Sequence, residues 1–410
     1  MASLKKNIFY SGILTTANYI FPLITYPYVS RVLGVANIGV CNFVDSIIHY
    51  FLIFSALGIG TVGIREIAKN KSDKEKLQKT FSQLFTINTI TTSIAVILLL
   101  IAMHTVPKLQ ENYELMWIGV LKLVFNYLLI EWLYKGLEDF KYVTNRTILV
   151  RCLYVLSVFI FVKNADDLGT YYFLTSATVV VNAIINLLYA RRVVQFKLCF
   201  SSLKDYSKSV GILGVYNILT SMYTTFNVAY LGFVSSDTQV GYYTTSTKIH
   251  SLILMAFTAV TGVLMPRIAS ILSEKRYTEY SRLIKKSIYI LLLFSIPCVI
   301  VLEFFAPEII YLIAGAGYEG AITPLRIIAP LVLIIGVEQI LITQSLVPMG
   351  KDRAILTNSL FGAFVGVLMN LTIVPRYRAV GSSIVWVLSE ITVMLCAIYF
   401  VRKSRKELNI

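Results

Sequence analysis

The sequence is poor in charged residues and rich in apolar ones. Charged side chains make up 14% of its 410 residues, whereas hydrophobic residues make up 57%. A soluble globular domain carries about a quarter charged residues, and its apolar stretches rarely reach the roughly 20 residues that cross a bilayer as a helix. The composition therefore excludes a soluble enzyme or binding module and predicts an all-α polytopic membrane protein.

The sequence also lacks the motifs of several chemistries. It contains no G-x-x-x-x-G-K-[ST] stretch, so the chain carries no P-loop ATPase of its own. Its five cysteines lie apart and none forms a C-x-x-C pair, which disfavours a disulfide framework and a metal site. No grouping of Ser, His and Asp or of paired carboxylates stands outside the apolar stretches. We therefore expect no catalytic residue, no metal and no other cofactor.

Twelve apolar stretches separated by polar breaks are long enough to span a bilayer. Six of them lie in residues 1–200 and six in residues 201–410, and these ranges are predicted to form an N-terminal and a C-terminal six-helix lobe. The predicted spans are residues 7–30, 38–63, 80–106, 114–134, 143–162, 168–190, 208–234, 240–265, 287–314, 322–347, 354–375 and 380–401.

Positive charge predicts the orientation of these spans. The net charge is +15, and with a cytoplasmic N-terminus 29 Lys and Arg residues fall on the cytoplasmic side. Five fall on the other side, and three lie inside spans. Cytoplasmic loops of membrane proteins carry such an excess of Lys and Arg. The basic residues are therefore interpreted as topology determinants rather than a nucleic-acid surface, and both termini are predicted to be cytoplasmic.

The two halves repeat each other weakly. The stretch SRVLGVANIGVCNFVDS around Leu33 returns as VAYLGFVSSDTQVGYYTTSTK around Leu231. In each, a Leu-Gly pair ends one span and a second glycine opens the next. Because each half has an even number of spans, the repeats would be parallel, with a substrate path between them. A chance match of so few positions is the alternative.

Polar residues follow one face of the first span and one face of the seventh. On the first span they recur at helical spacing, at Ser11, Thr15, Asn18, Pro22 and Thr25. On the seventh the same spacing gives Asn217, Thr220, Thr224 and Asn227. Such stripes either line a hydrated cavity or hydrogen-bond neighbouring helices. Their occurrence on equivalent helices of the two halves favours a cavity.

Ionisable residues inside the spans mark candidate sites, because an unpaired charge in the bilayer is costly. Asp45 and His49 are four residues apart and share a face of the second span, which would suit proton handling. Lys248 lies at the matching depth of the eighth span and would suit contact with a phosphate. The alternative for Asp45 and Lys248 is an ion pair between the lobes, or a side chain that reaches the membrane surface.

Other charged residues in or near the spans fit structural roles more simply. Arg31, at the outer end of the first span, fits an interfacial anchor, and Glu131 and Arg326 fit buried ion-pair partners. All three are retained as candidates. The candidate substrate or cavity contacts are Asn18, Arg31, Asn217, Thr224, Asn227, Lys248 and Arg326. The candidate ion-coupling residues are Asp45, His49 and Glu131.

Five longer stretches carry a family resemblance. Those of the first half are YPYVSRVLGVANIG, ALGIGTVGIREIAKNKSDKEKLQKTFSQLFTIN and IEWLYKGLEDFKYVTNRTILVR. Those of the second half are VGYYTTSTKIHSLILMAFTAVTGVLMPRIASIL and VPRYRAVGSSIVWVLSEI. GIREIA from Gly63 and EWLYKG from Glu131 are the most specific pieces. Through these stretches the sequence resembles the bacterial O-antigen and capsule repeat-unit flippases of the multidrug/oligosaccharidyl-lipid/polysaccharide exporter superfamily. The resemblance runs essentially from one end of the chain to the other, in order.

The resemblance implies two six-helix lobes in a V around a central cavity that opens alternately to either side. The substrate would be an oligosaccharide repeat unit on undecaprenyl diphosphate, moved from the inner to the outer leaflet of the cytoplasmic membrane. Membrane lipid, a polysaccharide polymerase and a chain-length regulator would be its partners. Arg31, Asp45 and Lys248 are carried over because relatives place charged groups on these helices. A cationic cavity would suit the diphosphate.

Two alternatives belong to other functional classes. A multidrug or cation antiporter of the same superfamily would share the fold, but would favour an acidic cavity, whereas acidic and basic residues inside these spans nearly balance. A membrane polymerase or ligase of the same pathway would show a long outer loop bearing Arg or His. No outer loop here exceeds roughly ten residues, so we predict a transporter rather than an enzyme.

Overall fold

The computed structural model describes residues 4–201 and 203–407, without the side chains at 4, 5, 8, 19, 223, 224, 255–263, 265, 266 and 269. Regular structure in these residues is entirely helical, and they contain no strand. The predicted all-α class is therefore confirmed. The helices form two compact units, unit 1 over Met1–Ile218 and unit 2 over Leu219–Ile410.

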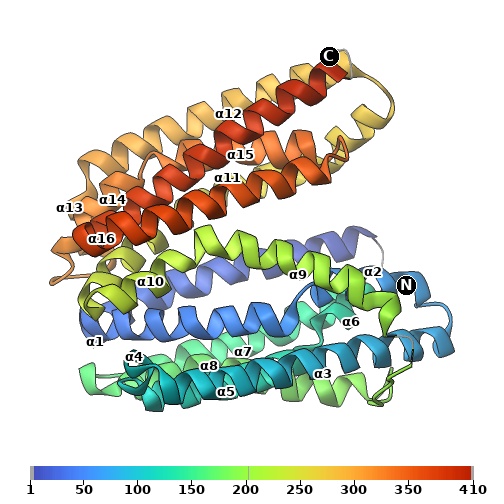
Figure 1. The fold of residues 1–410 in the computed structure, drawn as a ribbon, viewed down its shortest axis with the longest axis horizontal. Coiled ribbons are helices and arrows are strands. Elements are labelled where there is room, and N and C mark those ends of the chain that lie inside the picture. The colour runs from blue at the N-terminus through green and yellow to red at the C-terminus, as the bar shows by residue number, and fades with distance from the viewer. Residues whose placement is uncertain (1–3, 202, 408–410) are drawn as a thin grey trace. The chain divides into compact units, whose positions relative to one another are not determined.

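Unit 1 contains long helices joined by short turns (Figure 1). They are α1 (Leu4–Ala56), α2 (Ile59–Asn70), α3 (Lys74–Thr105), α4 (Pro107–Gln110), α5 (Tyr113–Asn126), η1 (Tyr127–Leu129), α6 (Glu131–Gly136), α7 (Phe140–Phe161), η2 (Ala165–Asp167), α8 (Leu168–Ala190) and α9 (Lys204–Thr224), the last of which runs into unit 2.

Unit 2 also consists of helices joined by short turns, and one of its helical turns is unusual. Its elements are α10 (Phe226–Val234), α11 (Asp237–Ser273), α12 (Tyr277–Phe304), α13 (Ala306–Ile313), η3 (Glu319–Ala321), α14 (Ile322–Ile328), α15 (Leu331–Leu341), η4 (Ile342–Leu346) and α16 (Asp352–Glu407). The element η4 is a π-helix, a widened helical turn. Such turns are rare in proteins, and those that occur are often found at functional sites.

The described residues contain eight helical stretches long and apolar enough to cross a membrane. Two of them, Phe9–Asn70 and Asp352–Glu407, are 62 and 56 residues long, and each covers two predicted spans. Two further predicted spans fall on helices outside these eight, one on α9 and α10 and one on α11. The polytopic character of the chain is thus confirmed.

Backbone breaks interrupt three of the apolar helical stretches. Within α1, Gly34 adopts φ 76° and ψ 167°, a left-handed conformation that glycine adopts without a steric penalty. Within α16, Arg378 adopts φ 51° and ψ −125°. A third break, at Ile130 with φ 39°, separates η1 from α6 inside the predicted fourth span. Each break lets one continuous apolar sequence change direction.

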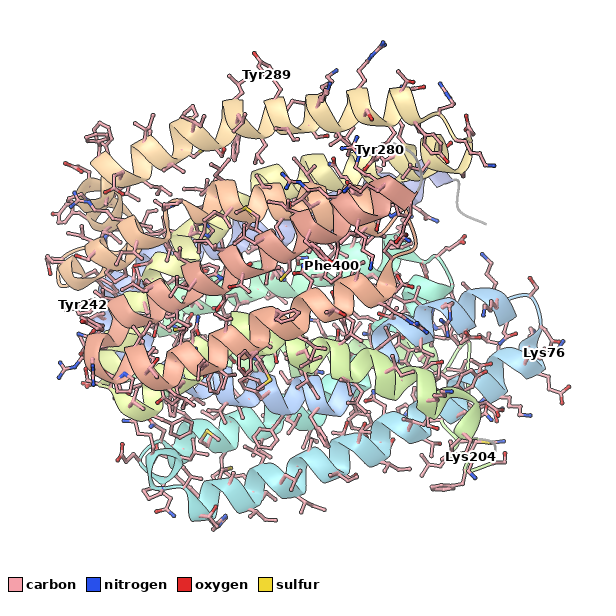
Figure 2. All side chains as sticks on the ribbon, turned by 45° about the horizontal axis from the view of Figure 1, so that its top comes forward. Lys76, Lys204, Tyr242, Tyr280, Tyr289 and Phe400 are labelled. Atoms are coloured by element: carbon pink, nitrogen blue, oxygen red, sulfur yellow. The ribbon has the colours of Figure 1, made fainter. Side chains whose placement is uncertain are left out.

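Basic residues gather at one end of each unit. In unit 1, Lys76 and Lys204 lie at the same end, although they are far apart in sequence (Figure 2). In unit 2, Lys351 pairs with Glu407 at 2.6 Å, and Arg405 donates to the Ser281 hydroxyl at 3.1 Å. These contacts bring together the start of α12, the start of α16 and the end of α16. We refer to these two regions as the basic ends of the units.

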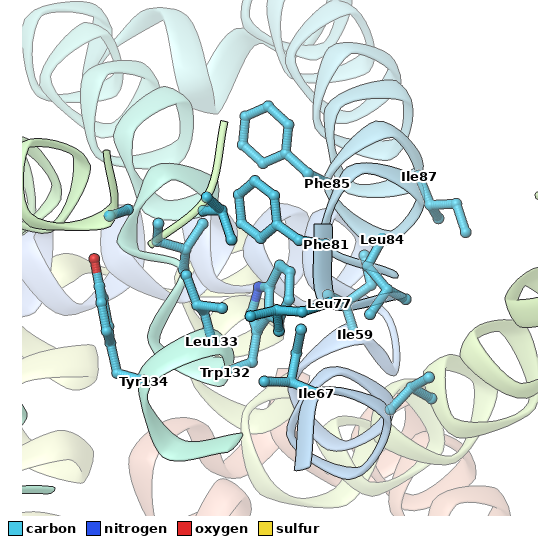
Figure 3. Packing of buried hydrophobic residues seen from close by; sticks show 14 of the residues in the cluster. Ile59, Ile67, Leu77, Phe81, Leu84, Phe85, Ile87, Trp132, Leu133 and Tyr134 are labelled. Carbon is cyan, nitrogen blue, oxygen red and sulfur yellow. The ribbon is translucent and has the colours of Figure 1, made fainter. Parts of the chain in front are cut away.

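The core at the basic end of unit 1 is built around Trp132 (Figure 3). Its indole stacks on the ring of Phe81, with centroids 5.5 Å apart and an interplanar angle of 29°. Gly63 of α2 also lies against the indole, and a Cβ added there would stand 2.7 Å from the ring. Gly63 therefore lets α2 approach α6 closely enough to enclose the tryptophan.

This packing predicts that Gly63→Ala destabilises unit 1. Alanine normally stabilises a helix relative to glycine by about 0.5–1 kcal/mol, but overpacking a core costs about 1–3 kcal/mol. We expect the melting temperature of the purified protein to fall. Gly60→Ala is the matched control, because Gly60 lies on the same helix and a Cβ added there would have no atom within 4 Å. Equal melting temperatures for the two variants would contradict this account of the core.

Candidate functional site

The most distinctive charged group inside the spans of unit 1 is an ion pair between α1 and α5. The Lys122 ammonium donates to the Asp45 carboxylate. The Tyr172 hydroxyl of α8 donates to the same carboxylate oxygen at 3.4 Å. We call Asp45, Lys122 and Tyr172 the Asp45 site. Three helices that are distant in sequence thus meet at one carboxylate.

A glycine allows the Asp45 site to form. An added Cβ at Gly119 would stand 2.5 Å from the side chain of Ile48. The absence of a side chain there brings α5 against α1, so that Lys122, one turn along α5, reaches Asp45. The lysine side chain is 17% exposed and the aspartate side chain 47%. The carboxylate is therefore neutralised by a largely buried cation but still accessible from one side.

Of the other two candidate ion-coupling residues, His49 lies near the Asp45 site and Glu131 does not. His49 lies one turn from Asp45 on the same helix and is exposed, within electrostatic reach of both Asp45 and Lys122. Glu131 belongs to a separate cluster at the basic end of the unit. There it pairs with Arg146 at 2.7 Å and with Lys135 at 3.0 Å. The structure therefore divides the three candidate ion-coupling residues between two places.

The second cluster, the Arg146 network, is centred on a buried guanidinium. The Arg146 side chain is 3% exposed, and besides Glu131 it donates to the side-chain oxygen of Asn186 on α8. Asn186 also accepts from the Tyr142 hydroxyl at 3.0 Å, and its amide donates to the carbonyl of Leu129. These partners offset the burial of the charge, and among the described residues only the Arg146 Nε is left without a hydrogen-bond partner in this guanidinium.

The left-handed turn at Ile130 positions Glu131 for this network, because α6 begins in a new direction directly after it. Beside the network lies a cavity of about 210 Å³, lined among others by Asn88, Asn126, Tyr127, Glu131, Trp132 and Lys135. A carboxylate, an ammonium group, amides and aromatic rings are thus gathered around one small space. The remaining lining is mainly apolar and includes Ile59, Ile64 and Leu129, so the cavity suits a ligand with an apolar face and a few hydrogen-bonding groups.

The remaining candidates of unit 1 make local contacts. Asn18 is exposed on α1. Arg31 is exposed as well, and its guanidinium donates to the carbonyl of Pro27 at 3.2 Å. The Asn217 amide donates to the carbonyl of Leu57 at 2.8 Å, which satisfies the end of α1 where Leu57 takes a positive φ of 41°.

The candidates of unit 2 lie apart from one another. Asn227 is buried, donates to the Tyr243 hydroxyl at 3.2 Å and accepts from the amide of Asn370. Lys248 is half-buried on α11. Arg326 is exposed and donates to the carbonyl of Glu303 at 3.0 Å. The side chain of Thr224 lies outside the described residues.

Several residues of these clusters were not among the candidates, including Arg146, Tyr172 and Asn186. Arg146 was counted with the basic residues of the cytoplasmic side, near the start of the predicted span 143–162, yet it is buried within α7. Tyr172 and Asn186 lie near the start and near the end of an apolar helix, α8. A signal existed for Asn186, since a lone asparagine in an apolar span usually hydrogen-bonds a neighbouring helix. Among the described residues, no group of three or more His, Cys, Asp or Glu could hold a metal ion.

Known proteins with similar sequences are transporters. The chain is 26% identical to "Putative O-antigen transporter" of Escherichia coli K12 over 406 residues, which cover 98% of each protein. A protein of the same name from Shigella dysenteriae is 25% identical over 402 residues, 96% of this chain and 98% of the relative. Neither name describes an enzyme.

Solved structures with the same fold are transporters as well. An inward-facing multidrug resistance transporter of the MATE family, within the MOP superfamily, matches with a TM-score of 0.72 over 95% of this chain and 94% of its own, at 15% identity. The lipid II flippase MurJ in an inward closed conformation matches with a TM-score of 0.75 over 98% and 90%, at 13% identity. These likenesses establish the fold.

Family profiles cover most of the chain. The MatE profile matches residues 213–372. The profile described as polysaccharide biosynthesis protein matches residues 4–272, more than half of the sequence. The resemblance to repeat-unit flippases of the exporter superfamily is thereby confirmed, and the chain belongs to the polysaccharide biosynthesis protein family.

Proposed function

We propose that this protein is a flippase for a lipid-linked oligosaccharide. It carries an O-antigen or capsule repeat unit on undecaprenyl diphosphate from the inner to the outer leaflet of a bacterial cytoplasmic membrane, by alternating access. The observation that carries the proposal is the end-to-end similarity to the two O-antigen transporters. Both termini would be cytoplasmic.

The chemistry of the substrate explains why apolar spans hold charged groups. The polyprenyl tail can stay in the bilayer, whereas the diphosphate and sugars cannot cross hydrocarbon without polar partners. Fixed Arg and Lys side chains replace the lost water around a diphosphate through charge-assisted hydrogen bonds. Arg31, Lys248 and Arg326 are proposed for this role, and Asn18, Asn217, Thr224 and Asn227 are proposed to contact the sugars.

The cavity beside Glu131 supports a contact with the headgroup before it is moved. It lies at the basic end of unit 1, the end assigned to the cytoplasm, where the substrate is made. Its carboxylate, amides and ammonium group can donate to and accept from sugar hydroxyls. Ion coupling is proposed for Asp45, His49 and Glu131, and a polysaccharide polymerase and a chain-length regulator are proposed as partners downstream.

A second candidate is a multidrug or cation antiporter. It is favoured by the MatE profile over residues 213–372 and by the fold shared with a MATE family transporter. Such a protein would bind a small cation near an accessible carboxylate. In the Asp45 site the carboxylate is already paired with Lys122, which disfavours a second cation there.

Deleting the gene separates the two candidates. A flippase predicts that full repeat units accumulate on undecaprenyl diphosphate at the inner leaflet and that surface polysaccharide is lost. Mass spectrometry of extracted lipids would identify the accumulated saccharide. Normal surface polysaccharide together with increased sensitivity to cationic drugs would instead establish the antiporter.

A charge-neutral double variant tests whether the Asp45 site acts in transport. Asp45→Asn alone leaves the Lys122 ammonium unpaired and should lower both melting temperature and transport. Asp45→Asn combined with Lys122→Met removes both charges and should restore the melting temperature. If Asp45 couples ions, transport by the double variant stays about tenfold or more below wild type, or about 1.4 kcal/mol in the barrier. Full recovery of transport would leave the pair a purely structural role.

Lys248→Ala tests the proposed contact with the diphosphate. We expect surface polysaccharide to fall at least about tenfold while the protein remains in the membrane, because a charge-assisted contact to the headgroup is lost. Lys285→Ala is the matched control, since Lys285 is an exposed lysine of the same unit. Wild-type polysaccharide in the Lys248 variant would exclude the contact.

A further inference from the structure

Unit 2 contains a pair of buried carboxyl groups that the proposed function does not use. Glu338 of α15 is 9% exposed and Glu390 of α16 is 4% exposed, and the two carboxyl groups lie close enough to interact electrostatically. The helices α15 and α16 pack side by side within this unit (Figure 1). Glu390 lies about midway between the break at Arg378 and Arg402, roughly 18 Å along the helix from each. The pair is therefore deep within the predicted membrane region.

Among the described residues, no lysine or arginine forms an ion pair with either carboxyl group. The ion pairs of unit 2 in this part of the chain join other acidic groups, and none reaches Glu338 or Glu390. Two neighbouring carboxylates out of water repel each other, and burial without a cation favours the neutral acid. Glu338 Oε2 is buried and has no hydrogen-bond partner among the described residues, so we expect the pair to hold at least one proton at neutral pH.

The groups around the pair are neutral hydrogen-bonding side chains. The Trp386 indole donates to Glu390 at 2.9 Å. The His250 ring packs edge-on against that indole, with centroids 5.2 Å apart. His250 is fully buried, and neither ring nitrogen has a hydrogen-bond partner among the described residues. Tyr243 lies seven residues before His250, hence on the same face of α11, and is close enough to interact electrostatically with Glu390.

The other titratable groups on neighbouring helices are directed elsewhere. Lys248 lies on a different face of α11 from Tyr243 and His250. Arg326 of α14 is exposed and binds the carbonyl of Glu303, and Tyr280 of α12 donates to Ser345 at 2.9 Å. The charge of the site is thus set by its two carboxyl groups and by the imidazole next to Trp386.

Buried amides lie between the pair and the basic end of unit 2. Gln344 sits in the π-helical turn that follows α15 and is completely buried, and no atom of its amide has a partner among the described residues. The same holds for Asn358 in the second turn of α16, which is 1% exposed. Each of these amides can donate and accept a hydrogen bond. They are polar groups that lie between the basic end and Glu338.

We propose that Glu338 and Glu390 form a proton-binding site inside unit 2, reached from its basic end past Gln344 and Asn358. The ligand is a proton, exchanged between the carboxyl pair and water on that route. The site is additional to the Asp45 site of unit 1, where a lysine, not a proton, neutralises the carboxylate. The inference holds whichever substrate the transporter carries.

Infrared spectroscopy of the full protein in liposomes tests this proposal directly. The wild-type protein should show the carbonyl band of a buried protonated carboxyl group at neutral pH. The band should disappear in the double variant Glu338→Gln and Glu390→Gln and remain in the control Glu303→Gln, which alters an exposed carboxyl of the same unit. An unchanged band in the double variant, or no such band in the wild type, would overturn the proposal.

Two further measurements keep the test decisive if the double variant does not fold. In Glu390→Gln alone the proton partner of Glu338 becomes an amide, so the band should shift in frequency. A band that stays in place would contradict the shared proton.

Replacing potassium by sodium in the buffer shows whether the carboxyl pair binds a proton or a metal cation. Loss of the band on adding sodium would show that the carboxylates bind the cation, and the proton assignment would be wrong.

Discussion

The cost of burying charge in an apolar environment governs both units. A charged side chain inside a span must meet an opposite charge, several hydrogen-bond donors or acceptors, or a proton. Unit 1 uses opposite charges, at the Asp45 site and in the Arg146 network. Unit 2 holds its two carboxyl groups against each other and against neutral side chains. The same constraint is therefore met in two chemically different ways.

This difference separates rigid parts from responsive ones. In the Arg146 network, Asn186 uses both its side-chain oxygen and its side-chain nitrogen, and Arg146 has ionic and neutral partners. Together with the stack on Trp132, the network ties α2, α3, α6, α7 and α8 at one end. In that network and its tryptophan stack, single atoms such as Arg146 Nε and Trp132 Nε1 lack a partner. In the interior of unit 2, among its described residues, the amides of Gln344 and Asn358 lack a partner for both the oxygen and the nitrogen. Groups that lack fixed partners can change partners at low cost.

The sequence predicted what depends on composition and periodicity, and failed where partners depend on three-dimensional approach. The helical class and the placement of most spans followed from apolar runs of sufficient length. The break at Ile130 was missed, because no proline or glycine marks it. The pairing of Asp45 with Lys122 could not be anticipated, since it depends on the close approach of helices at Gly119. Arg146 was counted with the cytoplasmic basic residues because the positive-inside pattern does not distinguish a loop residue from a buried residue near the start of a helix.

The Asp45 site also constrains how the protein is made. Asp45 and Lys122 are separated by 77 residues, and the chain is synthesised from its N-terminus. The segment that carries the carboxyl group therefore enters the bilayer before its lysine exists. Until α5 arrives, that carboxyl group lies in an apolar environment without its counter-charge. Insertion of α5 then supplies the counter-charge, so the arrival of this later helix completes the packing of an earlier one.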